Sequence, residues 1–126
     1  KNVIRRSGEN IAAVEVEAVL LRHPAVKAAA VAATPDPVRG DEVFALIVPH
    51  DKPVDAQAAA RLADDIVAHC LGRLAYYKAP GWIAFAEALP LTSTQKIQRG
   101  ELKTAVAERM AAGDVLDTRA LKKRTA

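Results

Sequence analysis

Residues 25–48 read AVKAAAVAATPDPVRGDEVFALIV, and this stretch decides the fold. Residues 25–33 are a run of alanine and valine whose length and boundaries favour a buried strand, and residues 43–48 favour a second strand that stops at Pro49. The loop between them contains Pro35 and Pro37, which we expect to prevent continued strand pairing there. Because so short a link cannot contain a parallel crossover, the sheet is predicted to be mixed or antiparallel.

Helical and extended segments flank these two strands. Upstream, residues 3–11 indicate a short β-hairpin whose turn lets Gly8 or Asn10 take positive φ. Residues 14–22 then carry apolar side chains at helical spacing. Downstream, Asp55 can cap a helix that Gly72 ends, residues 82–86 favour a third strand, and a last helix with an apolar stripe follows residue 96.

The predicted fold is therefore α+β: a small three-stranded mixed or antiparallel sheet flanked by helices and preceded by an N-terminal β-hairpin. Residues 1–112 are expected to form one domain. The apolar stripe fades from Gly113 onward, so residues 113–126 are predicted to be a loosely held extension.

Composition narrows the classes of function. The chain has 126 residues, of which 51% are hydrophobic and 26% charged, as in an ordinary globular domain. Its net charge of +3 is mildly basic, but acidic residues are interspersed, and the cluster at residues 122–124 is read as a solvated end. No apolar run is long enough for a membrane span, so a cytoplasmic location is the default expectation.

Cysteine and histidine usage indicates neither a disulfide nor a metal site. The single cysteine, Cys70, lies on the apolar face of a predicted helix and is interpreted as a buried thiol. No residues have metal-ligand spacing, and His23, His50 and His69 lack the mutual spacing of a metal site or a catalytic triad.

Three stretches are candidates for chemistry. In residues 6–11, RSGENI, a glycine turn can expose backbone N–H groups to a ligand, although an ordinary hairpin has the same pattern. Residues 76–80, YYKAP, place two tyrosines and a lysine between a helix end and a strand, which simple packing also explains. In residues 90–102, PLTSTQKIQRGEL, Lys96 is either a cation for phosphate or carboxylate oxygens or a solvent-facing lysine.

These stretches occur in one order together with VEVE at residues 14–17, TPDPVRGD at 34–41 and LPLTSTQKIQR at 89–99. As a set they resemble the adenylate-forming superfamily, which includes acyl- and aryl-CoA synthetases, peptide-synthetase adenylation domains and luciferases. The resemblance covers residues 1 to about 110 and identifies the chain as the small C-terminal domain that follows a hinge. It implies that a large N-terminal domain, absent from this chain, holds ATP, Mg²⁺ and the carboxylic acid, so that this chain alone is inactive.

The resemblance also implies roles for individual residues. Lys96 matches the family's catalytic lysine, which would bridge the carboxylate and phosphate oxygens during adenylation. After the domain rotates, the turn would reach the active site, where the backbone near Gly8 lines the pantetheine tunnel of CoA and Glu9 positions a side chain of the large domain. The residues implied in CoA or pantetheine binding are Ser7, Gly8, Glu9, Asn10, Tyr77 and Lys78.

The sequence departs from the family pattern at two positions. Gln95 stands where the family often has glycine, which reduces the freedom of the lysine loop. Gly81 stands where a basic residue commonly follows the Tyr-Lys-x-Pro segment, so Tyr77 and Lys78 are the candidates left at that site.

Two alternatives stay open at this point. An adenylation domain that serves a carrier-protein pantetheine has the same motifs, although no phosphopantetheine-serine motif follows residue 110. A basic α+β module that binds nucleic acid through Lys96, Arg99, Lys103 and the terminal cluster is the alternative of another class, and it lacks stacking aromatic residues in a plausible groove.

Overall fold

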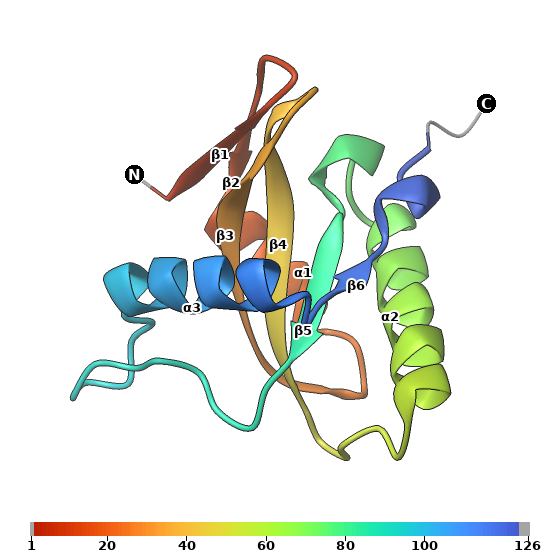
Figure 1. Cartoon of the computed structure of the whole chain (residues 1–126), viewed down its shortest axis with the longest axis vertical. Coiled ribbons are helices and arrows are strands. Elements are labelled where there is room, and N and C mark those ends of the chain that lie inside the picture. Colours follow the sequence, from red (N-terminus) through yellow and green to blue (C-terminus); the bar gives the residue numbers. More distant parts are fainter. Residues whose placement is uncertain (1, 124–126) are drawn as a thin grey trace.

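The computed structural model describes residues 2–123 and contains one mixed sheet with helices on both faces (Figure 1). The α+β class and the N-terminal hairpin are thereby confirmed. The elements in chain order are β1 Val3–Arg6, β2 Glu9–Ala12, α1 Ala13–Leu20, β3 Val26–Asp36, β4 Gly40–Pro49, α2 Ala56–Leu71, the 3₁₀ turn η1 Tyr76–Lys78, β5 Trp82–Phe85, α3 Arg99–Ala112, β6 Leu116–Asp117 and the 3₁₀ turn η2 Arg119–Leu121.

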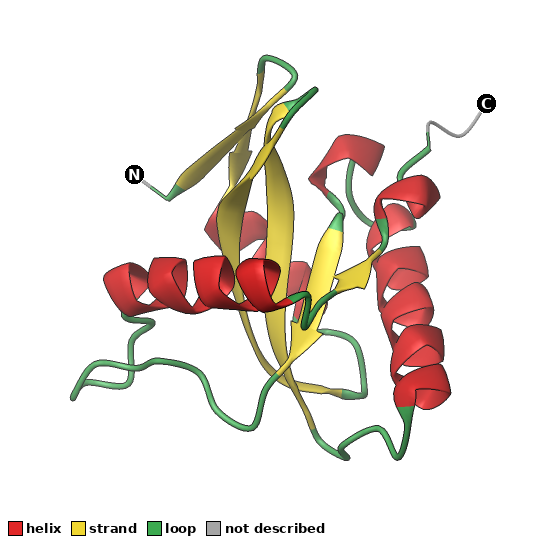
Figure 2. Ribbon diagram, in the orientation of Figure 1, coloured by secondary structure: helices red, strands yellow, loops and turns green. Residues whose placement is uncertain are grey.

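Strand β4 is the centre of the sheet. It pairs antiparallel with β3, as the short link between them predicted, and parallel with β5, with α2 in the crossover connection. Helices α1 and α2 pack in one core on one face, and α3 packs in a second core on the other (Figure 2). Side chains along β4 alternate between the cores, which explains why its sequence is an unbroken apolar run.

The sheet is larger than the three strands expected, because the hairpin and the C-terminal residues both join it. Strand β1 meets β4 at the pair Arg6↔Gly40, and β6 pairs antiparallel with β5. Strand β3 also continues through Pro35, which pairs with Asp41, so the expectation that the prolines end the pairing there was wrong. A proline at the end of an edge strand is tolerated because its missing N–H breaks no ladder hydrogen bond.

Residues 114–123 do not form the loosely held extension expected from the sequence. Residues 116–117 pair with β5, and the Thr118 hydroxyl donates to the carbonyl of Pro80 at 2.8 Å. Lys122, expected in a solvated end, has a fully buried side chain. These contacts join the segment to the domain; residues 124–126 lie outside the described part of the chain. Within residues 2–123, no helix combines the length and the apolar character that crossing a membrane requires.

Candidate functional site

Lys96 lies in the connection between β5 and α3, which projects at the lower left of Figure 1. An antiparallel bridge joins Leu91 to Ile97, and the N–H of Gln98 donates to the carbonyl of Pro90 at 2.8 Å. Closer to the tip, the N–H of Thr92 donates to the carbonyl of Lys96 at 2.7 Å. The lysine is therefore carried on a small hydrogen-bonded hairpin with a defined stem.

The tip of this hairpin contains a left-handed residue directly before Lys96. Gln95 has φ +67°, and its N–H donates to the carbonyl of Thr92 at 2.9 Å. The hydroxyl of Thr92 accepts from the N–H of Lys96 at 3.2 Å. The left-handed conformation explains why glycine suits this position, since a side chain there costs about 1–2 kcal/mol.

The side chain of Lys96 is open to solvent. The residue is exposed, and its side chain makes no hydrogen bond or ion pair with any residue between 2 and 123. The group is thus available to anions from outside this domain.

Arg99 fixes the stem on the helix side. Its guanidinium donates to both carboxylate oxygens of Glu17 on α1, at 2.8 and 3.0 Å. The same two side chains also hydrogen-bond to the backbone of Val31 on β3. Glu17 accepts from the N–H of Val31 at 2.8 Å, and Arg99 donates to the carbonyl of Val31 at 3.2 Å. The pair therefore satisfies backbone groups of an edge strand and ties the start of α3 to α1.

The turn of the N-terminal hairpin has two left-handed residues, Ser7 at φ 51° and Gly8 at φ 83°. Two such residues between the paired Arg6 and Glu9 form the tight turn that matches the twist of a two-stranded ribbon. The N–H of Ser7 donates to the carbonyl of Arg39 at 2.8 Å, which holds this tip against the β3–β4 turn. A Cβ added at Gly8 would meet open space.

The other two residues of the turn differ in their surroundings. The side-chain carbonyl of Asn10 accepts from Arg5 at 2.9 Å, so it already has a partner on the neighbouring strand. Glu9 is exposed. The turn thus offers open space at Gly8 and an exposed carboxylate at Glu9 that makes no hydrogen bond within residues 2–123.

Tyr77 and Lys78 belong to η1, near the same end of the domain as the hairpin. The ammonium of Lys78 contacts the carboxylate of Glu15 on α1 at 2.9 Å, and this hydrogen bond raises the pKa of Lys78, with a further electrostatic contribution from Glu9. The ring of Tyr77 meets that of Tyr76 edge to face, with centroids 5.6 Å apart.

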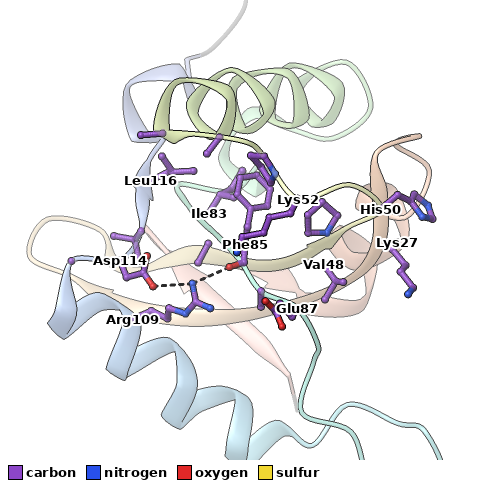
Figure 3. A pocket seen from close by; sticks show the side chains of 18 residues that line it. Lys27, Val48, His50, Lys52, Ile83, Phe85, Glu87, Arg109, Asp114 and Leu116 are labelled. Carbon is purple, nitrogen blue, oxygen red and sulfur yellow. Dashed lines mark hydrogen bonds and ion pairs between the residues drawn. The ribbon is translucent and has the colours of Figure 1, made fainter.

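The structure therefore separates the predicted site residues into two groups. The hairpin turn lies at the top of the molecule in Figure 1, with η1 at the same end, and the Lys96 connection projects near the bottom. A groove of about 930 Å³ lies between the ends of β4 and β5, the start of α2 and the end of α3 (Figure 3). None of the predicted site residues lines it, and its Arg109 is held by Asp114 and the carbonyl of Phe85.

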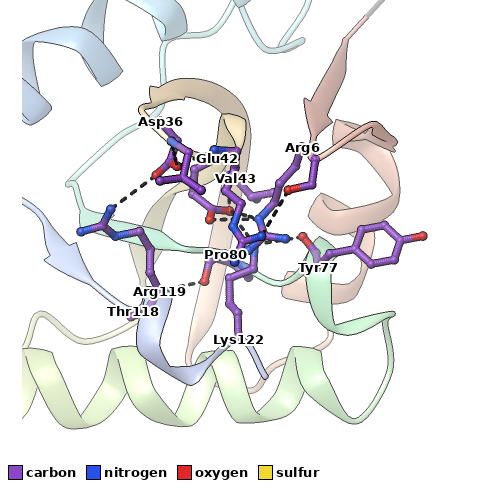
Figure 4. A network of polar contacts seen from close by, with 12 residues as sticks. Arg6, Asp36, Glu42, Val43, Tyr77, Pro80, Thr118, Arg119 and Lys122 are labelled. Atoms are coloured by element: carbon purple, nitrogen blue, oxygen red, sulfur yellow. Dashed lines mark hydrogen bonds and ion pairs between the residues drawn. The ribbon is translucent and has the colours of Figure 1, made fainter. Parts of the chain in front are cut away.

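Sequence reasoning missed a buried charge network behind the hairpin end (Figure 4). The carboxylate of Glu42 accepts from Arg6 at 3.0 Å and from the ammonium of Lys122 at 2.5 Å. Burial lowers the pKa of Lys122 to about 8, although the contact with Glu42 opposes the shift. The one available signal was a glutamate at the head of the apolar run 43–48, since a charge at the start of a buried strand needs a partner.

No group of three or more histidine, cysteine or acidic residues within residues 2–123 is arranged to hold a metal ion. Cys70 is buried, and burial raises the pKa of its thiol to about 12. His23 and His69 tie α1 to α2: His23 contacts Asp65 at 2.6 Å, and His69 contacts the carbonyl of Val19 at 2.8 Å.

Comparison with known proteins identifies relatives of this domain. Residues 15–96 match the family described as the AMP-binding enzyme C-terminal domain. The chain is 38% identical over 114 residues to the 2,3-dihydroxybenzoate-AMP ligase of Bacillus subtilis, covering 90% of this chain and 20% of that protein. It is 40% identical over 102 residues to the sulfoacetate–CoA ligase of Cupriavidus necator, covering 81% and 19%.

A solved structure shares the fold. The acyl-CoA synthetase of Brucella canis superposes with a TM-score of 0.77 at 35% identity, over 87% of this chain and 20% of that one. The chain thus spans about a fifth of the length of the curated relatives it matches.

Proposed function

Because the chain belongs to the AMP-binding enzyme C-terminal domain family, we propose that it is the mobile small domain of an ATP-dependent acyl- or aryl-CoA ligase. Relatives named as an AMP ligase and as a CoA ligase support the two half-reactions of this proposal, adenylation of a carboxylic acid and transfer to a thiol. A large N-terminal domain would hold ATP, the acid and Mg²⁺. The separation of Lys96 from the hairpin turn carries the proposal, because the two groups cannot face one active site at the same time.

In the first half-reaction, a carboxylate oxygen bonds to the α-phosphorus of ATP, and pyrophosphate leaves. Negative charge from two anions is brought together, and a cation that contacts both lowers the barrier. Lys96 suits this role because its ammonium is exposed and has no partner within residues 2–123, while its hairpin stem is held by backbone hydrogen bonds and by the pair Arg99–Glu17.

In the second half-reaction, the thiol sulfur of CoA bonds to the acyl carbon, and AMP and a proton are released. Rotation about the hinge would replace the Lys96 connection by the opposite end of the domain. There the open backbone at Gly8 can line a pantetheine tunnel, and Glu9 and Asn10 flank it. Tyr77 and Lys78 lie at the same end, although Glu15 already neutralises Lys78.

The test of the first role measures each half-reaction in the full-length ligase that carries this chain. Lys96→Ala is expected to slow pyrophosphate release by about two to three orders of magnitude, while supplied acyl-adenylate is still converted to the CoA thioester. Lys103→Ala removes another exposed lysine of the same region and should change neither rate. Equal loss of both half-reactions in Lys96→Ala would contradict the assignment.

The second role is tested with a pair of glycines that both have positive φ. Gly8 and Gly113 both have φ near +80°, at 83° and 72°, and a Cβ at either meets open space, so leucine adds similar strain at both. Gly8→Leu is expected to slow thioester formation and spare adenylation, and Gly113→Leu should spare both. The reverse selectivity in Gly8→Leu would refute the role of the turn.

The alternatives predict different acceptors. A carrier-protein ligase would transfer the acyl group to a pantetheine-loaded carrier protein faster than to CoA, which parallel acyl-transfer assays compare directly. For the nucleic-acid alternative, two of its proposed cations already have carboxylate partners, Arg99 with Glu17 and Lys122 with Glu42. We therefore expect no shift of random-sequence DNA or RNA at moderate salt.

A further inference from the structure

The carboxylate of Glu42 lies between the two elements that the proposed function assigns to thioester formation. Oxygen Oε1 accepts from Nε of Arg6 at 3.0 Å, and Oε2 accepts from Nζ of Lys122 at 2.5 Å (Figure 4). Oε2 also accepts from the N–H of Val43 at 2.8 Å. The glutamate is therefore held on both oxygens by its own strand, by β1 and by the C-terminal segment.

Each of the two cations is connected to one element of the proposed thioester site, Arg6 through the chain and Lys122 through a hydrogen bond. Arg6 is the last residue of β1 and directly precedes the Ser7–Gly8 turn. Lys122 also donates to the carbonyl of Tyr77 at 2.9 Å, in the turn that contains Lys78. Close by, the Thr118 hydroxyl donates to the carbonyl of Pro80 at 2.8 Å. One carboxylate thus links the hairpin turn to η1.

Burial makes this link stiff. The side chains of Glu42 and Lys122 are 1% and 0% exposed, and that of Arg6 is 6% exposed. A buried charge that loses its partner is strongly unfavourable, so each of the three groups constrains the others. The network contains two cations and one anion, and the carbonyl of Tyr77 supplies the second acceptor that Lys122 needs.

We propose that Glu42, Arg6 and Lys122 are positioning residues for the thioester half-reaction: they hold the Ser7–Gly8 turn and the Tyr77–Lys78 turn in one fixed relation. The inference rests on the proposed function. The proposal adds the C-terminal segment to the site, because Lys122 of that segment contacts Glu42, which also binds Arg6 of the hairpin. Within residues 2–123, none of the hydrogen bonds of the network involves the Lys96 connection, so the network bears on one half-reaction and not on the other.

The experiment uses Lys122→Met in the full-length ligase, because methionine keeps length and apolar volume while Glu42 retains Arg6 as a partner. Lys123→Met is the matched control, since Lys123 is exposed. We expect Lys122→Met to release pyrophosphate within about twofold of the native rate. Single-turnover transfer from supplied acyl-adenylate to CoA should fall at least about tenfold, with a raised KM for CoA and an unchanged KM for ATP.

Glu42→Gln serves as the second variant and should reproduce the same selectivity more strongly. Three outcomes would each overturn the inference. Equal loss of both half-reactions, or a Lys122→Met enzyme that no longer folds by circular dichroism, would show that the network only stabilises the fold. No loss of either half-reaction would show that the network does not position the two turns. Failure of the proposed function is distinguishable, since the native ligase would then form no thioester with CoA in the first place.

Discussion

Gly81 offers a sharp test of the rigidity assigned to the Glu42 network. The residue is buried, and a Cβ built on it would lie 2.5 Å from Cδ of Glu42, 2.6 Å from Cγ and 2.9 Å from Oε1. Real Cβ atoms essentially never approach other atoms this closely. Gly81→Ala therefore forces either the backbone of β5 or the side chain of Glu42 to move. The same geometry explains why no basic side chain occupies this position.

The expected loss of stability follows from the contacts that such a movement breaks. Overfilling a packed site costs about 1–3 kcal/mol. Displacing Glu42 also weakens its bonds to Arg6 and Lys122, and losing one hydrogen bond to a charged group costs about 1.5–3 kcal/mol. We therefore expect Gly81→Ala to lower the free energy of unfolding by about 3–5 kcal/mol, a large effect for one methyl group.

Urea unfolding of the 126-residue chain measures this change. Trp82 is the single tryptophan, lies in β5 next to the substitution and has the guanidinium of Arg119 at 4.5 Å from its ring centroid, so its fluorescence reports loss of the fold. Far-UV circular dichroism provides the second probe required for a two-state analysis.

Gly72→Ala is the matched control. A Cβ at Gly72 would lie 3.8 Å from the carbonyl oxygens of Ala68 and His69, which is an ordinary contact, and its φ of −80° is open to any residue. This variant should be neutral or up to about 1 kcal/mol more stable. If Gly81→Ala costs less than about 1 kcal/mol, Glu42 relaxes freely and the network cannot hold the two turns in register.

Two further predictions concern buried titratable groups. Cys70 is fully buried with its pKa raised to about 12, so a thiol reagent at pH 8 should label it only after denaturation; rapid labelling of the folded chain would contradict its burial. The pKa of Lys122 is about 8 in the folded chain against 10.5 normally, so the unfolded chain binds more protons between these values and stability rises with pH. Relative to Lys122→Met, the free energy of unfolding of the native chain should thus rise by at most about 3 kcal/mol from pH 8 to 10, as measured by urea unfolding. A rise in that free energy when the pH is lowered would refute the lowered pKa of Lys122.

Local signals account for the parts of the fold that were predicted correctly. Asp55 caps α2 through a hydrogen bond from the N–H of Ala58 at 2.8 Å, as a short acceptor side chain before an apolar periodic segment indicates. Gly8 takes positive φ in the hairpin, and the short link between β3 and β4 enforces antiparallel pairing. Each of these features depends on residues close together in the chain, so periodicity, capping and turn chemistry suffice.

By itself, the sequence determined the order of helices and strands, the hairpin turn and the position of Lys96 between a polar loop and a helix. Only the tertiary structure decided that Lys122 is buried and that Glu42 joins it to Arg6, because these partners are 80 and 36 residues from Glu42 along the chain. It also decided that the Lys96 connection and the hairpin turn lie at opposite ends of the domain. No local pattern encodes such distances, since they arise when the two cores close on the faces of one sheet.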